Sequence, residues 1–583
     1  MFRAKTFVSA LVLLLALATT PLRAAEKKDV LSLVPPESQV VIVVKDLAAL
    51  NSDISKLATR LNVENPGTQS PLETLKFFSG VVNGLDDNGS IAITMPYVPM
   101  MMAPGVAPPI LAFIPVTDYK AFAGNFGVAE PGDGVSAIHF QGTPAWIKPC
   151  GNYALFSLDE ATLNAYVAPT QGNFATRAGL IPGSIIQSSD IFAYINITSI
   201  APQLAPMVAM QMAQQKAQMM GMMGAQAAQA GMGIDIASSV IQAVLRDGES
   251  ICIGLNASEV GFGARFALQF KEGSPLAAQF AKSPASELSF DRLPNQPYFF
   301  VFSADLSTLP LQEWTKTLAT LMPADAPFTI DPSGLSTLNQ SYSRFQAGLY
   351  PPNIAAGGGF INSVTVIPTD NPEALLASIK EGMLAANSMQ LPQGMTVQAE
   401  YTENAIVIEG LKRVDSFRSK TTLPPEQMQA VPAFAASFLE QKGFYIPVKG
   451  AVVQVIGTDP SKLKEIASAA DGSSDLADAH ISAIRANLLP NRVVEGYLGF
   501  GSVAKFANSF LSLFFPAYII ESQENLPPIA VGVSVGGGGV AGSLHVPVEI
   551  VEVAKSWIEK VQRQQQQQQL PPQPEPETTP EVQ

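Results

Sequence analysis

Methionine is the residue type whose spacing most clearly suggests chemistry in this chain. Eight of the 18 methionines fall in residues 207–233, which include the run AQMMGMMGAQAAQAGMG. Thioether sulfur is a soft ligand suited to Cu(I), and Met212, Met219 and Met223 would share one face of a helix. A second cluster lies in the loop MPYVPMMMAPGVAPP and consists of Met100, Met101 and Met102. The residue types therefore allow a soft-metal site.

Two other interpretations of the methionines are stronger. No His or Cys lies beside either cluster, and the glutamines and alanines around residues 207–233 are typical of a low-complexity structural insertion. Flexible methionine also suits an adaptable apolar surface for a protein partner or a lipid. We therefore predict no metal and no cofactor, favour a structural insertion, and keep the six methionines as a candidate partner or lipid surface.

Histidine and serine offer little for catalysis. The only histidines are His139, His480 and His545, and none has a Cys, His or acid at metal-ligand spacing. No GxSxG nucleophile elbow is present. His545 alternates with Leu544 and Val546, which predicts that it faces away from the core. We predict no catalytic residues, and a hydrolytic enzyme with an unrecognised site is kept only as an alternative.

Five aspartates each follow an expected strand and open an expected helix. They are Asp46, Asp118, Asp305, Asp370 and Asp459. Aspartate is a preferred N-cap because its carboxylate accepts hydrogen bonds from unpaired N–H groups of the first turn. Glu373 would complete a capping box with Asp370, and Pro460 would stand in the first turn after Asp459. We predict that these aspartates are structural.

The N-terminus reads MFRAKTFVSALVLLLALATTPLRAAEKK. Arg3 and Lys5 precede an apolar stretch over residues 7–18, and a small residue follows at Ala24. This order is typical of a secretory signal peptide, here residues 1–24. No later window of about 18 residues is apolar enough to span a bilayer. We expect an exported protein without a transmembrane segment after signal cleavage, located in the periplasm, the envelope or outside the cell.

The two cysteines are Cys150 and Cys252. An exported protein can oxidise its thiols. Each cysteine lies in an apolar, strand-like run, which also suits a buried thiol. A Cys150–Cys252 disulfide and two buried thiols both remain open.

The charge balance argues against two classes of partner. The formal charge is −14, and loss of Arg3, Lys5 and Arg23 with the signal peptide would make it −17. A protein this acidic lacks the basic surface that nucleic acid or an anionic membrane face attracts. We therefore expect no nucleic-acid partner.

Pairs of segments repeat in the same order along the chain. VIVVKDLAAL matches FFVFSADLSTL, and IPVTDYKAF matches VIPTDNPEAL. GTPAWIKPCGNYALFSL aligns without gaps onto GMTVQAEYTENAIVIEG, and CIGLNASEVGFGARFALQF onto AVGVSVGGGGVAGSLHVPV. FAYINITSIA matches EGYLGFGSVA, but the distance to the next repeated segment is 25 residues longer in the first copy. We infer an internal duplication with a methionine-rich insertion at about 207–233.

Alternation and helical spacing predict an α+β fold with mainly antiparallel sheets. Two halves each hold two units in β-α-β-β-α order, a ferredoxin-like arrangement. The first half covers residues 25–287, with units at about 30–170 and 180–287. The second covers 288–563, with units at about 288–420 and 489–563 and an extra strand–helix piece at about 425–475. Residues 564–583 are rich in glutamine and proline and are expected to be disordered.

The segment LVPPESQVVIVVKDLAAL, followed by IPVTDYKAF, resembles a loose group of exported bacterial proteins of unknown function with repeated strand–helix units. The resemblance implies location and architecture and carries no catalytic residues. We expect a non-enzymatic binding or scaffold protein whose partner is an unknown protein or a hydrophobic ligand. This hypothesis predicts no clustered polar residues in any pocket and an exposed apolar patch near the methionines. A hydrophobic-ligand or lipid carrier is the nearest alternative and would need a deep apolar cavity.

Overall fold

The fold is seen in a computed structural model, which divides into two compact units. Unit 1 comprises described residues 29–51 and 70–178, and unit 2 comprises 52–63 and 179–569. The structure describes residues 29–569 except 64–69, 98–108, 171–173, 224–226, 285–287, 312, 314–342, 353–361, 389–394, 425–427, 429–438, 474–475, 477–478 and 522–524. The expected signal peptide, residues 1–24, therefore lies outside the described residues.

Unit 1 is built on an antiparallel sheet with strand order β1-β2-β3-β6-β5-β4. Its strands are β1 (Val40–Val44), β2 (Ile91–Met95), β3 (Leu111–Pro115), β4 (Ser136–Phe140), β5 (Thr143–Cys150) and β6 (Tyr153–Ser157). Its helices are η1 (Val30–Ser32), α4 (Pro71–Ser79), α5 (Tyr119–Gly124), α6 (Glu160–Ala165) and α7 (Phe174–Arg177), and α2 (Leu47–Arg60) runs on into unit 2. Phe122 of α5 packs into a core with Ile147 and Ala154 of the sheet.

Unit 2 contains one continuous antiparallel sheet with strand order β7-β8-β9-β19-β18-β17-β10-β11-β12-β16-β15-β14-β13. The strands are β7 (Ile191–Asn196), β8 (Gly248–Ser258), β9 (Gly261–Phe270), β10 (Phe300–Asp305), β11 (Arg344–Tyr350), β12 (Asn362–Pro368), β13 (Thr396–Thr402), β14 (Asp415–Thr422), β15 (Glu440–Val448), β16 (Ala451–Ile456), β17 (Arg492–Leu498), β18 (Ile529–Gly536) and β19 (Gly539–Pro547). Strands from both expected halves of the chain therefore share this sheet.

Helices cover the two faces of the unit 2 sheet unequally. The described helices and 3-10 or π segments are α8 (Leu180–Ser188), α9 (Ile197–Met223), α10 (Ala227–Asp247), α11 (Pro275–Gln279), α14 (Pro372–Ala385), η4 (Ala386–Ser388), η7 (Pro460–Lys462), α17 (Leu463–Ser468), η8 (Ala469–Ser473), α18 (Ala479–Arg485), α19 (Phe500–Phe514), η9 (Pro516–Tyr518) and α20 (Val548–Gln569). On one face, α17 and α18 pack on β10, β12, β16 and β17, while α8 packs on β8 and β9. On the other face, α14 packs on β12, β14, β15 and β16. Among the described residues, no helix packs on this second face over β8, β9, β18 and β19, where several large apolar side chains are exposed.

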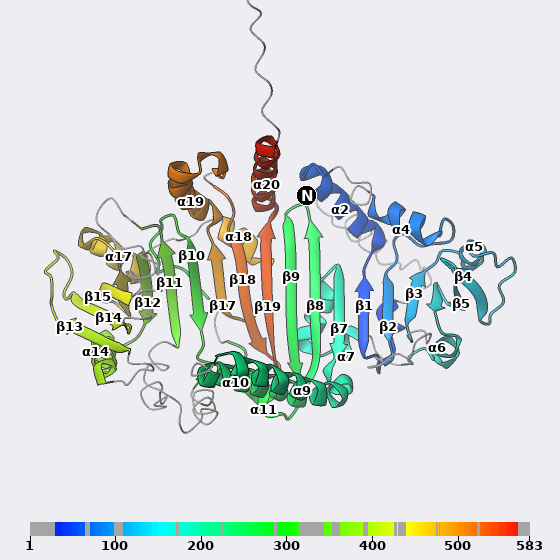
Figure 1. Cartoon of the computed structure of the whole chain (residues 1–583), viewed down its shortest axis with the longest axis horizontal. Helices are drawn as coiled ribbons and strands as arrows, with labels where there is room; N and C mark the ends of the chain where they lie inside the picture. The colour runs from blue at the N-terminus through cyan, green and yellow to red at the C-terminus, as the bar shows by residue number, and fades with distance from the viewer. Residues whose placement is uncertain are drawn as a thin grey trace, which may run out of the picture. The chain divides into compact units, whose positions relative to one another are not determined.

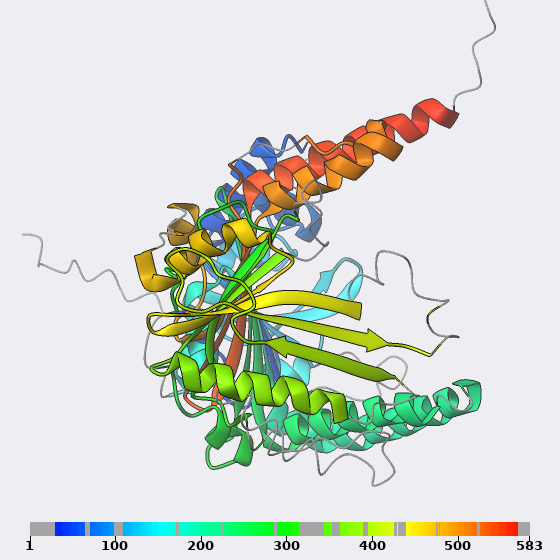
Figure 2. The same ribbon diagram turned by 90° about the vertical axis from the view of Figure 1, so that its left-hand side faces the viewer.

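Two pairs of helices leave opposite ends of the central strands. α9 and α10 form an antiparallel hairpin between β7 and β8, and α19 and α20 lie at the other end of the strands (Figure 1). Turned by 90°, the green pair and the orange and red pair both project from the same side of the sheet (Figure 2). This is the side on which the central strands are uncovered.

The expected α+β class and mainly antiparallel pairing are confirmed. In unit 1, apolar segments of the chain form β1, β2, β3 and β6. The aligned segment 394–410 does not repeat the hairpin of β5 and β6, because only β13 forms there and it pairs with β14. α20 continues to Gln569, so residues 564–569 of the expected disordered tail are helical, and residues 570–583 lie outside the described residues.

The aspartates mostly cap turns, with one exception. Asp118 accepts hydrogen bonds from the N–H groups of Lys120 and Ala121. Asp46, Asp305 and Asp459 likewise accept bonds from backbone N–H groups two or three residues later. Asp370 does not cap α14, because Asn371 takes that position and accepts from Ala374. The expected capping box is therefore wrong, and Glu373 forms an ion pair with Arg413 instead.

None of the helices within the described residues combines the length and apolarity of a membrane span.

Candidate functional site

The methionine-rich segment forms a helical hairpin. Met212 and Met219 are half-buried on α9, and Met207 and Met210 on the same helix are exposed. Lys216 of α9 pairs with Asp235 of α10 at 2.6 Å, which ties the two helices together. Met223 ends α9, but its side chain lies outside the described part of the structure, as do Met100, Met101 and Met102. Groups of three or more His, Cys, Asp or Glu suited to a metal ion do not occur among the described residues.

The cysteines and histidines do not assemble a reactive site. Cys150 and Cys252 are not joined by a disulfide bond. His139 and His480 are exposed. The expectation that His545 faces away from the core is wrong, because its side chain is only 5% exposed. Burial, followed by the nearby charge of Arg265, lowers the pKa of His545.

The uncovered part of the unit 2 sheet is apolar throughout. On β8, Ile253 and Leu255 alternate with Gly254. A Cβ at Gly254 would meet Ile185 of α8, so Gly254 lies on the face that α8 covers. Because neighbouring residues of a strand point to opposite faces, Ile253 and Leu255 point to the uncovered face. The exposed side chains of this open face are Ile253, Leu255, Phe262, Phe266, Val531, Val533 and Leu544, each 36–48% exposed. Strand register makes the other open-face positions apolar too: Ile251, Ala257, Ala264, Leu268, Ile529, Val540, Gly542 and Val546.

The register arranges the open face in rows across four strands. Leu255 of β8 pairs with Ala264 of β9, which pairs with Leu544 of β19. Leu544 in turn pairs with Val531 of β18. The neighbouring row joins Ile253, Phe266, Gly542 and Val533 in the same way. Paired side chains on one face of a sheet lie close together, so these residues form a contiguous surface.

The opposite, covered face of the same strands carries the polar side chains. Ser250, Gln269, Ser534, Ser543 and His545 are all buried there. Arg265 is also turned to this side, donates hydrogen bonds to Ser188 and Asn256, and has its pKa lowered by burial. An antiparallel sheet with one solvated face ordinarily places apolar residues on the covered face and polar residues on the open one. In this part of unit 2 the arrangement is inverted.

Comparisons with models of protein families, with curated proteins and with solved structures found no match.

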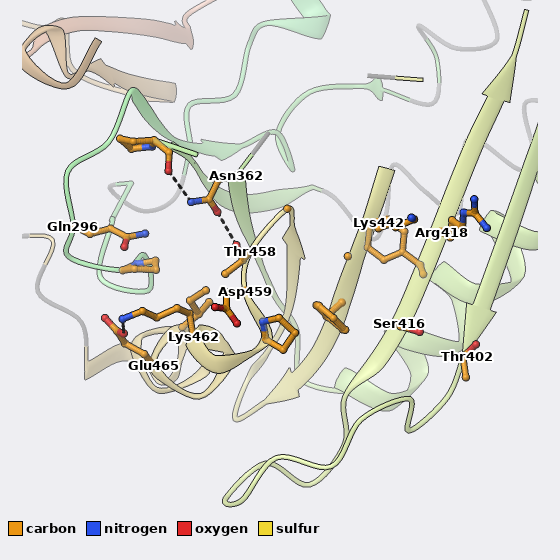
Figure 3. A pocket seen from close by; sticks show the side chains of 18 of the residues that line it. Gln296, Asn362, Thr402, Ser416, Arg418, Lys442, Thr458, Asp459, Lys462 and Glu465 are labelled. Carbon is orange, nitrogen blue, oxygen red and sulfur yellow. Dashed lines mark hydrogen bonds and ion pairs between the residues drawn. The ribbon is translucent and has the colours of Figure 1, made fainter. Parts of the chain in front are cut away.

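A polar pocket of about 730 Å³ lies at the other end of the unit 2 sheet (Figure 3). Its walls come from β13, β14 and β15 and from the turn that leads into η7 and α17. Asn362 is fixed between the carbonyl oxygen of Pro351 at 3.1 Å and the hydroxyl of Thr458 at 2.6 Å. This clustering of polar residues contradicts the expectation that no pocket would contain one.

Five of the six charged side chains that line this pocket have partners in the structure. Arg418 and Lys442 both pair with Glu440, at 2.9 and 3.0 Å. Lys462 pairs with Glu465 at 3.1 Å. Asp459 accepts a bond from the N–H of Ser461, and this hydrogen bond lowers its pKa. The lining carries three cations and three carboxylates, so it presents no net charge to attract a charged ligand.

The open face was not among the features predicted from the sequence. The signal was present, because strand segments such as ICIGL in β8 and IAVGV in β18 are apolar or small at both alternating positions. In an antiparallel sheet such a pattern means either two covered faces or one exposed apolar face. Only the packing of the helices decides between them.

Proposed function

We propose that this protein is an exported, non-enzymatic binding protein that carries a hydrophobic ligand, such as the acyl chain of a lipid, on the open face of unit 2. The inverted polarity of the central strands carries this proposal. Contiguous exposed apolar surface is unfavourable in water, and in soluble proteins it marks an interaction site. A ligand that covers the open face would remove this apolar area from water.

The chemistry of the open face favours hydrocarbon over a polar ligand. Its side chains offer no hydrogen-bond donor or acceptor, and the backbone groups of these strands pair with one another. Interfaces between proteins carry about one hydrogen bond per 100–200 Å². A surface without such groups therefore fits an acyl chain better than a typical protein partner. The face is open, so the ligand would lie along the strands and not in the deep cavity that the sequence analysis required of a carrier.

The flanking hairpin supports the same function. Met207 and Met210 are exposed on α9, and Val240 and Ile241 are exposed on α10. Methionine adapts its shape to different apolar partners. The hairpin is therefore a candidate for covering part of the ligand, through Met207 and Met210, whereas the predicted Met212 and Met219 are half-buried.

Gly542 provides a direct test of the proposal. It lies in the middle of the open face, its backbone is not in the left-handed region, and a Cβ there would meet no atom within 4 Å. Gly542→Lys thus places a charge on the face without displacing a packed side chain, and Gly542→Val adds similar bulk near the backbone without charge. We expect the lysine variant to bind a dansyl-labelled fatty acid about tenfold or more weakly than the valine variant, because the ammonium must be desolvated.

Both variants should unfold at urea concentrations no lower than the wild-type protein. Equal affinity of Gly542→Lys and Gly542→Val would refute binding on the open face. Lipid extraction of protein purified from its own envelope, followed by mass spectrometry, would then identify what the wild-type protein carries.

We also propose that the internal duplication is real but that its hairpins correspond differently from the gapless alignment. The order β10-β11-β12-β16-β15-β14 matches β1-β2-β3-β6-β5-β4, and α14 follows β12 as α5 follows β3. The turns between β5 and β6 and between β15 and β16 hold Gly151 and Gly450, both with positive φ. Asp159 and Asp459 then cap the next helical turns. The expected extra piece around Asp459 would thus be the counterpart of β5, β6 and α6.

A further inference from the structure

The C-terminal end of α19 is an uncharged apolar tip. Six consecutive residues, 512–517, are exposed, and they include Leu513 at 75%, Phe514 at 69% and Phe515 at 58%. The chain has no charged side chain between Lys505 and Glu521. We refer to residues 512–517 as the apolar tip.

Hydrogen bonds hold the apolar tip in this exposed position. Asn508 donates to the carbonyl oxygen of Ile520 at 2.7 Å and accepts from its N–H at 2.8 Å, which closes the chain behind the tip. From α20, Trp557 donates to the carbonyl oxygen of Tyr518 at 2.9 Å, and Gln564 donates to that of Ala517 at 2.8 Å. The phenylalanines are therefore presented outward by a braced turn.

Aromatic rings adjoin the apolar tip. The ring of Tyr518 contacts that of Phe515, and Trp557 of α20 donates to the carbonyl oxygen of Tyr518. Amphipathic rings of this kind are enriched where hydrocarbon meets water at a bilayer surface. α20 also carries Lys560, which pairs with Glu521 at 2.8 Å, and continues through Arg563 to Gln569.

We propose that the apolar tip inserts into the surface of a zwitterionic lipid bilayer and docks unit 2 there. The inference rests on the proposed function, because a docked carrier would exchange its acyl ligand with that bilayer. Charge complementarity selects the occupant: the tip carries no charge, and the chain as a whole is acidic at −14. A zwitterionic surface does not repel such a protein, whereas an anionic surface does. The tip and the helices flanking the open face project from the same side of the sheet (Figure 2).

Flotation with vesicles of phosphatidylcholine tests the proposal on the full mature chain. We expect the wild-type protein to float with the vesicles and the variant Leu513→Asn/Phe514→Asn/Phe515→Asn to bind about tenfold or more weakly, because three exposed apolar side chains are lost. Val407→Asn is the matched control, since Val407 is 97% exposed elsewhere in unit 2. Replacing part of the phosphatidylcholine by phosphatidylglycerol should weaken binding at low salt.

A second variant keeps the test valid if the triple variant misfolds. Phe514→Trp is conservative, and its fluorescence should shift to the blue and be quenched by brominated phosphatidylcholine. Unchanged flotation of the triple variant, or no quenching of Phe514→Trp, would overturn the proposal. A tip-dependent dimer without flotation would also overturn it, in favour of a second copy of the chain.

The Gly542→Lys variant separates this inference from the proposed function. It should float like the wild-type protein while binding the labelled fatty acid weakly. If the triple variant floats normally and Gly542→Lys loses the ligand, docking fails and the carrier stands. If the triple variant loses flotation and Gly542→Lys binds the ligand as well as Gly542→Val, the carrier fails and docking stands.

Discussion

Replacing Leu255 by alanine should weaken both folding and ligand binding, because one part of this side chain is buried on folding and the other would be buried by the ligand. Leu255 lies on β8 in the same row as Ala264 and Leu544, and 48% of it is exposed. About half of the side chain is therefore packed when the protein folds. The other half would be covered only when a ligand lies on the open face.

The size of both effects follows from this exposed fraction. Burial of a CH₂ group contributes about 0.8 kcal/mol, and Leu→Ala removes three carbon atoms, so complete burial of these atoms is worth about 2.4 kcal/mol. Because 48% of Leu255 stays exposed in the folded protein, only about half of this energy is gained on folding. The substitution should therefore lower the free energy of unfolding by about 1 kcal/mol. It should weaken ligand binding by a further 1 kcal/mol or so, which is about a fivefold rise in Kd.

Two measurements on the same samples check this division. Urea unfolding gives the stability change, and titration with a dansyl-labelled fatty acid gives the change in Kd. Val260→Ala is the control, because Val260 is 56% exposed in the turn between β8 and β9 but is not part of the open face. A loss of stability with an unchanged Kd would show that the ligand does not cover Leu255 and would refute this account of the open face.

Two further predictions concern the covered face. Glu495→Gln should lower the free energy of unfolding by about 3 kcal/mol, because the fully buried Glu495 pairs with Arg485 at 2.9 Å and Arg492 at 2.7 Å, and its loss leaves two guanidinium groups uncompensated. A loss below about 1 kcal/mol in urea unfolding would contradict this estimate of a buried ion pair. His545 has a lowered pKa in the folded protein because of burial and Arg265, so the unfolded chain binds its proton first as the pH falls below about 6.5. The wild-type melting temperature should therefore drop more between pH 7.5 and 5.5 than that of His545→Gln, and equal drops would exclude His545 as the cause.

Local sequence signals were sufficient where short-range physics decides the structure. Alternating apolar residues predicted β1 and β6, and the helical spacing after Asp118 predicted α5. The capping role of Asp118 could be read from its position, because an N-cap bonds only to its own first turn. The same reasoning failed at Asp370, where the adjacent Asn371 competes for the cap before Pro372 and takes it.

What the sequence by itself determined is the class of elements, the acidic charge and the absence of a recognisable catalytic motif. The polarity of the central sheet was decided only by the tertiary structure. Leu544 and His545 are neighbours whose alternation requires opposite faces, but the chain alone does not say which face a helix will cover. In the folded protein, the residues around Leu489 pack over Ser543 and the sheet face that it shares with His545, while Leu544 remains on the open face. Helix placement depends on contacts between residues far apart in the sequence, and it is this placement that turned an apolar strand face into a candidate binding surface.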